Sequence, residues 1–208
     1  MTLADPLHDG ASVRAFVALV LDAPTRQAID AAVTGMRHAL GDDADAIRWG
    51  STDALHVTVR FLGDVAPPTL AALRDAIRDR VRDHAPVAVR LAGAGTFPPR
   101  GAPRVVWIGV EADAALARLH AAVEDACASV GMTREGRPYR PHLTVGRPRA
   151  GRAARGLPEA LARVGFVAAT QVASLHLMRS DLSAAGARHT ALDVVPLVGG
   201  GAPGREAR

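Results

Sequence analysis

The sequence predicts an α+β fold built as a single domain. Strand-like and helix-like patterns follow one another along the chain, but not in the regular strand–helix–strand alternation typical of a doubly wound parallel sheet. No long linker divides the chain, and its 208 residues, 49% of them apolar and 22% charged, suffice for one full hydrophobic core. We therefore expect one domain over residues 12–197, with loose ends at 1–11 and 198–208.

Each strand and helix that we expect is indicated by the local pattern of apolar residues. Short apolar runs rich in β-branched residues indicate strands, and we place these at residues 13–21, 47–49, 55–63, 87–97, 105–110, 142–145, 172–179 and 189–195. Apolar residues at helical spacing indicate helices, two of them opened by proline, at about 24–40, 67–82, 114–130 and 157–163. The stripes predicted to face the core are Ile29, Val33, Met36 and Leu40, then Leu70, Leu73, Ile77 and Val81, then Leu116, Leu119, Val123, Cys127 and Val130.

The basic residues are all arginines. Lysine and arginine together number 25 and none is lysine, which excludes Schiff-base, lysyl-nucleotide and Walker-loop chemistry. A net charge of +4 and a pI near 10.7 favour a polyanionic partner. Seven arginines fall within residues 134–155, and this segment is either a solvated loop or a rim that attracts phosphate.

Other features of the sequence bear on the compartment. No apolar run approaches the roughly 18 residues that span a bilayer, and no signal-peptide cleavage pattern follows the apolar run at 15–21. Cys127 is the only cysteine, so no internal disulfide can form, and its place on a helical stripe predicts a buried, inert thiol. We expect a cytoplasmic protein that does not associate with membranes.

One four-residue pattern occurs twice. HVTV at 56–59 is repeated as HLTV at 142–145, in each case inside a predicted strand. Because side chains alternate across a strand, the histidine and threonine share one face and the two apolar residues share the other. Each copy thus presents an imidazole beside a hydroxyl, and two lobes related by a pseudo-twofold axis would bring the copies face to face across one cleft.

The chain resembles the 2H phosphoesterase superfamily, and within it the RNA 2′,3′-cyclic phosphodiesterase (2′-5′ RNA ligase-like) branch. The matching segments are RAFVALVL (14–21), LHVTVRFLG (55–63), GAGTFP (93–98), PRVVWIGV (103–110), RPYRPHLTVGR (137–147) and LHLMRSDLSAAGARHTAL (175–192). The resemblance implies a bilobal fold in which two antiparallel-rich sheets line a central cleft, with helices outside. Two positions depart from the family: His189 replaces a usual tyrosine, which leaves that aromatic's role open, and Arg60 replaces a common lysine but keeps its charge.

The implied chemistry is hydrolysis of RNA 2′,3′-cyclic phosphate ends to 2′-phosphates. Such a reaction needs a base, an acid and donors to the phosphate oxygens. Imidazole suits both proton transfers near neutral pH, and threonine hydroxyls donate to the non-bridging oxygens, where charge develops. By the resemblance, His56 is the proton donor and His142 the proton acceptor, although the motifs alone do not distinguish them. Thr58 and Thr144 are then the phosphate-binding residues.

Two further residues and the cofactors follow from the same resemblance. Phe61 and Arg147 are implied to flank the terminal nucleobase, because an aromatic face and a guanidinium plane stack on any base. From the residues alone, Phe61 can instead be a core residue at a strand end, and Arg147 one more member of the basic segment. No cofactor and no metal are expected, because two histidines without carboxylate or cysteine companions fall short of a catalytic zinc set.

Other functions stay open at this point. The substrate can be an RNA end, or a small cyclic nucleotide or ADP-ribose cyclic phosphate. The chain can also be a non-catalytic RNA-binding module or a metal-dependent phosphodiesterase. Ligation of 2′-5′ ends is possible only as reversal of the hydrolysis, since a lysyl adduct is excluded. We expect a monomer.

The remaining histidines are expected to lie outside the site. They are His8 in the loose N-terminus, His38, His84 and His120 on helix surfaces, and His176 and His189 in strands without a threonine two residues on.

Overall fold

The computed structural model describes residues 11–51, 54–111, 113–152, 154, 156–183 and 186–199. The predicted loose ends therefore lie outside the described residues, apart from residue 11 and residues 198–199. No helix in the described part of the chain is long and apolar enough to cross a membrane.

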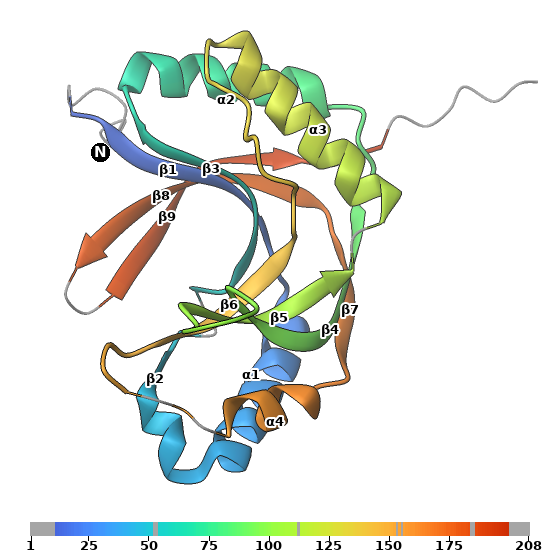
Figure 1. The fold of residues 1–208 in the computed structure, drawn as a ribbon. Helices are drawn as coiled ribbons and strands as arrows, with labels where there is room; N and C mark the ends of the chain where they lie inside the picture. The colour runs from blue at the N-terminus through green and yellow to red at the C-terminus, as the bar shows by residue number, and fades with distance from the viewer. Residues whose placement is uncertain are drawn as a thin grey trace, which may run out of the picture.

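Within the described residues, nine strands form one antiparallel sheet (Figure 1). Eight of them follow the order β7-β4-β5-β6-β3-β1-β8-β9, and β2 pairs with β6. The strands are β1 (Val13–Val20), β2 (Ile47–Trp49), β3 (His56–Val65), β4 (Val87–Phe97), β5 (Val105–Glu111), β6 (His142–Pro148), β7 (Phe166–Val172), β8 (Ser174–Ser183) and β9 (Gly186–Pro196).

The sheet has two halves that meet at one narrow point. Strands β1, β3, β8 and β9 form one half, and β2 and β4–β7 form the other. The register between β3 and β6 contains a single pair, Val57 with Leu143. The α+β class is confirmed, but the two expected sheets are joined into one, because the backbones of the two motif strands approach closely enough to pair. Val57 and Leu143 hold the same position, directly after the histidine, in the two motifs.

The helices cover the two halves separately (Figure 1). Helices α2 (Pro67–Val81) and α3 (Ala114–Ser129) pack on each other over one half, while α1 (Ala23–Leu40) and α4 (Leu157–Ala162) pack over the other. Asp22 and Asp113 accept from the backbone N–H of Thr25 and Leu116, at 2.8 and 2.7 Å. Each cap contributes about 1 kcal/mol to helix stability. A 3-10 helix, η1 (Gly41–Ala46), leads from α1 into β2.

Each half of the sheet, with its covering helices, contains segments from both the N-terminal and the C-terminal parts of the chain. Helix α1 follows β1 in sequence but packs against β7 and α4 on the opposite half. Helix α3 follows β5 yet packs against α2 and β3. The two motifs do lie in different halves of the sheet, as a two-lobed arrangement predicts, but the lobes are interleaved along the chain.

The sequence patterns located most elements and missed one strand. The predicted helical stripes are buried, except for Val130, which packs partly buried against the core. Cys127 is fully buried, as expected. Strand β7 was not predicted, because it lies at the edge of the sheet and most of its side chains are not buried, so its sequence lacks a clear pattern of apolar residues. Its Phe166 is 59% exposed and only Val172 among its seven residues is buried.

Candidate active site

All six residues singled out by the motifs and the resemblance line one cleft. This cleft has a volume of about 480 Å³ and takes its walls from β1, β2, β3, β6, β8 and β9, so both halves of the sheet contribute. The six residues are His56, Thr58, Phe61, His142, Thr144 and Arg147. The two copies of the motif therefore face a common space.

The two histidines are held in the same way. The Nδ1 atom of His56 lies 3.0 Å from the carbonyl oxygen of Ala54, and the Nδ1 atom of His142 lies 2.8 Å from that of Arg140. In both motifs the partner is the residue two positions earlier. Because a carbonyl oxygen only accepts, each Nδ1 carries the hydrogen and each Nε2 is left available for chemistry.

An aromatic ring supports each imidazole. Phe16 on β1 lies 4.6 Å from His56, centroid to centroid, and Phe97 on β4 lies 4.9 Å from His142 with its ring nearly perpendicular. These contacts restrict the ring orientations that the carbonyl hydrogen bonds select. The histidines are thus oriented from two sides.

Each motif also brings a threonine hydroxyl to the cleft. Thr58 and Thr144 each lie two residues after a motif histidine and line the cleft with it. Within the described residues neither hydroxyl makes a hydrogen bond. Both are therefore able to donate to a bound anion.

A β-bulge after each threonine turns the next functional residue into the cleft. On β3 the register with β1 shifts between Thr58 and Arg60, and on β6 the register with β5 shifts between Thr144 and Gly146. An extra residue reverses the face to which later side chains point. Phe61 and Arg147, each an odd number of positions after a histidine, consequently share the histidine's face instead of pointing away.

Phe61 is not a core residue. Its side chain is 62% exposed, although it lies in the middle of a ten-residue strand. Phe16 lies beneath it, with the ring centroids 6.3 Å apart. An exposed aromatic ring that lines the same cleft as the two motif histidines is available to stack on a planar group.

Burial dominates the protonation of His56. It lowers the pKa of this histidine from 6.5 to about 4, while the contact with the Ala54 carbonyl opposes the shift and the nearby His189 and His142 add to it. His56 is therefore neutral near pH 7 when no anion is bound.

His189 is a third imidazole in the cleft, which sequence reasoning placed outside the site. Its ring is edge-on to His56 at 5.1 Å and to Phe16 at 5.0 Å, between centroids. Burial lowers the pKa of His189. The search for a threonine two residues on missed it, because β9 reaches the site through the pairing of β9 with β8 and of β8 with β1. The one available signal was its place in the segment that resembles the family's closing hairpin.

The other histidines lie elsewhere. His38 is exposed on α1 as expected, but His84 and His120 are half-buried. His120 stacks on Tyr139 with the ring centroids 4.0 Å apart. His176 is half-buried, with its Nε2 atom 2.9 Å from the Ser174 hydroxyl. His8 lies outside the described residues.

The arginine-rich segment is not a continuous phosphate-attracting rim. Arg134 forms an ion pair with Asp125, and Arg137 is held by both carboxylate oxygens of Glu135 at 3.1 Å. Arg149 donates to the carbonyl of Asp45. Of the described arginines in the segment, Arg147 alone lines the cleft, and Arg155 lies outside the described residues.

A charged cluster fixes the segment that precedes the second motif. The Nε atom of Arg60 lies 2.7 Å from a carboxylate oxygen of Glu124 on α3, and an Arg60 nitrogen donates to the carbonyl of Thr133 at 2.7 Å. Farther along, the hydroxyl of Tyr139 donates to the carbonyl of Thr58 at 3.2 Å. Glu124 and the Arg60 side chain are buried. Loss of Arg60 leaves the buried Glu124 carboxylate without its closest cation, and loss of Glu124 leaves Arg60 only the more distant Glu135, at 3.6 Å. The first motif is thereby tied to the approach to the second.

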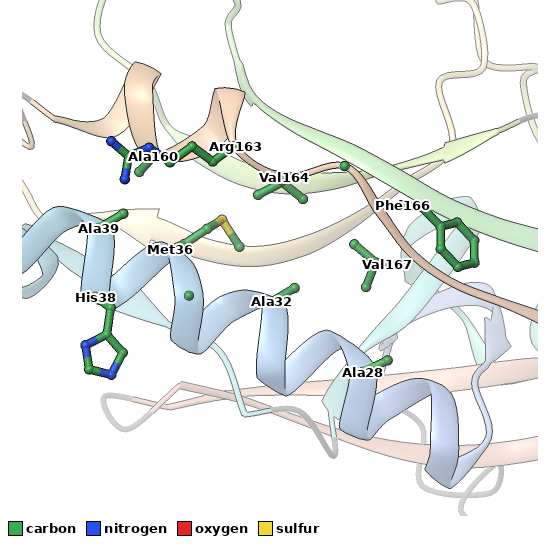
Figure 2. Close-up of a pocket in the computed structure, with 12 residues that line it drawn as sticks. Ala28, Ala32, Met36, His38, Ala39, Ala160, Arg163, Val164, Phe166 and Val167 are labelled. Atoms are coloured by element: carbon green, nitrogen blue, oxygen red, sulfur yellow. The ribbon is translucent and has the colours of Figure 1, made fainter.

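A second cavity, of about 610 Å³, lies away from the motifs between α1 and the α4–β7 segment (Figure 2). Figure 2 shows Met36 directed toward α4 and Val164, and alanines lining the α1 side. Its titratable residues are Arg163 and His38 alone among the described lining. It lacks the paired acid and base groups of the motif cleft.

The polar side chains that line the cleft include three imidazoles, hydroxyls and arginine guanidinium groups. Among the described residues, no group of three or more histidine, cysteine, aspartate or glutamate side chains is arranged to hold a metal ion. The side chains of this cleft are suited to proton transfer and to hydrogen bonding with an anion.

Fold and comparison together define a 2H phosphoesterase. A sequence model of the 2′-5′ RNA ligase superfamily matches residues 25–184. The chain belongs to this superfamily.

Relatives with established names agree with this placement. An RNA 2′,3′-cyclic phosphodiesterase of Methanothermobacter thermautotrophicus is 33% identical over 187 residues, which cover 89% of this chain and 99% of the relative. One of Geobacillus stearothermophilus is 37% identical over 135 residues, 64% of this chain but only 41% of the relative's length. The crystal structure of TT0787 of Thermus thermophilus superposes with a TM-score of 0.73 at 28% identity, covering 89% of this chain and 98% of that one.

Proposed function

We propose that this protein hydrolyses the 2′,3′-cyclic phosphate ends of RNA to 2′-phosphates without a metal ion. The names of its relatives support cyclic phosphodiester hydrolysis. The observation that carries the proposal is the paired arrangement of the motifs, which puts two imidazoles and two free threonine hydroxyls on one cleft.

In the proposed reaction, water attacks phosphorus and the bond from phosphorus to O3′ breaks. The Nε2 atom of His142 takes a proton from the water, and protonated His56 gives a proton to the departing O3′. Thr58 and Thr144 donate to the non-bridging oxygens, which gain negative charge in the five-coordinate transition state. The product keeps the phosphate on O2′.

The acid role requires a change in the protonation of His56. Its pKa of about 4 leaves it neutral in the free protein at pH 7. A bound phosphate anion close to the ring favours the charged form and raises that pKa. Substrate binding therefore supplies the negative charge that favours the protonated, proton-donating form of His56.

Phe61 and Arg147 are proposed to hold the terminal nucleobase. Phe61 is exposed on the cleft, and the guanidinium of Arg147 lies on the same face through the corresponding bulge. Stacking between a base and such groups tolerates any base and contributes about 1–3 kcal/mol. We therefore expect little preference for the identity of the terminal base.

The site is complete in one copy of the chain, since residues of this chain alone supply both motifs and the cleft lining. This supports a domain over 12–197 that acts as a monomer, which light scattering during size-exclusion chromatography tests. Cytoplasmic location remains part of the proposal.

The proposed function is tested with an RNA oligonucleotide that ends in a 2′,3′-cyclic phosphate, incubated in EDTA. Turnover to a 2′-phosphate, read by ³¹P NMR, is the expected result. Turnover that EDTA abolishes and added metal restores would point to a metal-dependent phosphodiesterase.

The substrate alternatives are separated with the same assay. Turnover of small cyclic nucleotides or ADP-ribose cyclic phosphate, with none of the RNA end, would overturn the assignment to RNA. Binding of RNA that survives loss of both histidines, with no turnover of any cyclic phosphate, would indicate a binding module. Formation of 2′-5′ linkages from cyclic phosphate and 5′-hydroxyl ends would show that the reaction runs in reverse.

A further inference from the structure

Two arginines that line the cleft lie opposite each other on neighbouring strands. Arg48 on β2 is the register partner of Arg147 on β6, in the antiparallel pairing of these strands. Both side chains are exposed and both line the cleft. Residues directly opposite on neighbouring strands have side chains close together, and like charges in that arrangement repel.

Nothing within the described residues neutralises this pair. Neither Arg48 nor Arg147 forms an ion pair or a side-chain hydrogen bond there, whereas Arg60, Arg134 and Arg137 are each matched by a carboxylate. Two neighbouring guanidinium groups that line the cleft without a carboxylate partner are suited to bind an anion together.

The local backbone is built to bring the two arginines together. A Cβ at Gly146 would lie 2.7 Å from Cγ2 of Ile47, so glycine is what lets β2 approach β6 closely. The indole of Trp49 donates to the carbonyl of Ala44 at 3.1 Å and anchors β2 from below. The bulge on β6 turns Arg147 toward the cleft. The short strand β2 is thus held against β6 with Arg48 beside Arg147.

We propose that Arg48, together with Arg147, forms a second phosphate subsite that binds the phosphodiester on the 5′ side of the terminal nucleotide. This inference rests on the proposed function and names its substrate class. The histidines and threonines take the cyclic phosphate, so a second cationic group serves a second phosphate. Guanidinium forks suit phosphate oxygens, and Arg147 can stack its plane on the base while its N–H edge reaches the anion.

This subsite distinguishes an RNA end from a simple cyclic mononucleotide. An RNA end carries a phosphate at the 5′ position of its last nucleoside, whereas a nucleoside 2′,3′-cyclic phosphate carries none. The protein should therefore prefer a substrate with a 5′-phosphate, even when that phosphate is the only addition.

The test compares kcat/KM for a nucleoside 2′,3′-cyclic phosphate with and without a 5′-phosphate, and for a short RNA with the same end. In the wild type the 5′-phosphate is expected to raise kcat/KM about tenfold, which corresponds to one charge-assisted hydrogen-bonded contact. Arg48→Gln should reduce this ratio to near one, and Arg48→Lys should retain part of it. Arg118→Gln, on the exposed surface of α3, removes the same charge elsewhere and should leave the ratio unchanged.

A second measurement does not depend on turnover. Affinity for a short RNA ending in a 2′-phosphate, followed by fluorescence anisotropy, should fall in Arg48→Gln, and the slope of log affinity against log salt should become shallower by about 0.7. Since Arg48 is exposed and its neighbour is like-charged, the variant should melt at or above the wild-type temperature.

The outcomes separate the inference from the function on which it rests. If cyclic phosphates are hydrolysed but the 5′-phosphate ratio is the same in wild type and Arg48→Gln, the subsite is wrong. If no cyclic phosphate is hydrolysed, the proposed function fails, and the anisotropy result alone then decides whether Arg48 binds phosphate. A ratio that falls equally in Arg118→Gln would reduce the effect to net charge and also overturn the subsite.

Discussion

Phe61 and Arg147 occupy equivalent places in the two motifs, each five residues after its histidine and each turned into the cleft by a bulge that follows the threonine. In unbroken strands both side chains would point away from the histidines. The same backbone irregularity has therefore produced an aromatic wall on one side of the site and a cationic wall on the other.

Removal of the aromatic wall should weaken substrate binding. Phe61→Ala is expected to raise KM by about 5- to 100-fold, because base stacking contributes about 1–3 kcal/mol, with a smaller change in kcat. Phe166→Ala is the matched control, since Phe166 is similarly exposed but lies on β7 outside the cleft. Equal effects of the two substitutions would show that Phe61 does not contact the base.

Loss of either motif histidine should nearly abolish turnover. His56→Gln and His142→Gln are each expected to lower kcat by about 10²–10⁴-fold, the range for a positioned general acid or base. The double variant should be little worse than either single one, because the two groups act as a unit. His38→Gln, on the exposed surface of α1, should retain full activity in the same rate assay.

The threonines should affect the rate more than the binding of substrate. Thr58→Val and Thr144→Val keep the shape of the side chain but remove the donor, and each is expected to lower kcat about 10²-fold, as for an oxyanion donor. Thr→Ser at either position keeps the hydroxyl and should restore most of the rate. Steady-state kinetics that show a rise in KM alone would assign the hydroxyls to ground-state binding.

Anion binding should be accompanied by proton uptake. Burial holds the pKa of His56 at about 4 in the free protein, so the ring is neutral at pH 6–7, and a bound phosphate raises that pKa and draws a proton from solution. Calorimetric titration with the 2′-phosphate product, in buffers of different ionisation enthalpy, counts these protons. His56→Gln should reduce the count, and an unchanged count would argue against His56 as the acid.

Substitution of His189 should shift the titration of its neighbour. When His189 is protonated, its charge lowers the pKa of His56, in addition to the larger effect of burial, so His189→Tyr should raise the pKa of His56 while an aromatic ring still contacts Phe16. Histidine titration by NMR measures the shift directly, and the pH profile of kcat/KM should move to higher pH with it. An unchanged pKa would leave His189 a packing residue.

The pairs His56–Thr58 and His142–Thr144 could be predicted because two-residue spacing on a strand determines a shared face. The place of Phe61 and Arg147 in the cleft was implied by the family resemblance but not by the local pattern, since alternation puts them on the opposite face and the bulges have no distinct pattern in the sequence. Local patterns also did not place Arg48 or His189 in the cleft, and the resemblance pointed to the position of His189 alone. Their positions depend on which strands become neighbours, β9 through β8 and β2 through β6, and local patterns carry no information about strand order.

Whether the arginine-rich segment is a solvated loop or a phosphate-attracting rim could not be decided from its sequence, for a related reason. Its density of positive charge was evident, but Arg134 is matched by Asp125 only once the segment packs against α3, whereas Arg137 is matched locally by Glu135, two residues earlier. The sequence shows how many arginine side chains a segment carries, but the ion pairs formed in the folded protein determine which of them can still bind a ligand.

The interleaving of the two lobes has a consequence for folding. The chain passes between lobes after β1, β2, α2, β5, α3 and β7, so neither lobe is a continuous piece of sequence. Contacts at such long sequence separation give a high contact order, which slows folding. A lobe that folded alone would gain too few contacts to offset the chain entropy lost in closing the long loops between its segments. Unfolding should then be a single cooperative transition, and no proteolytic fragment would retain half of the catalytic apparatus in a folded state.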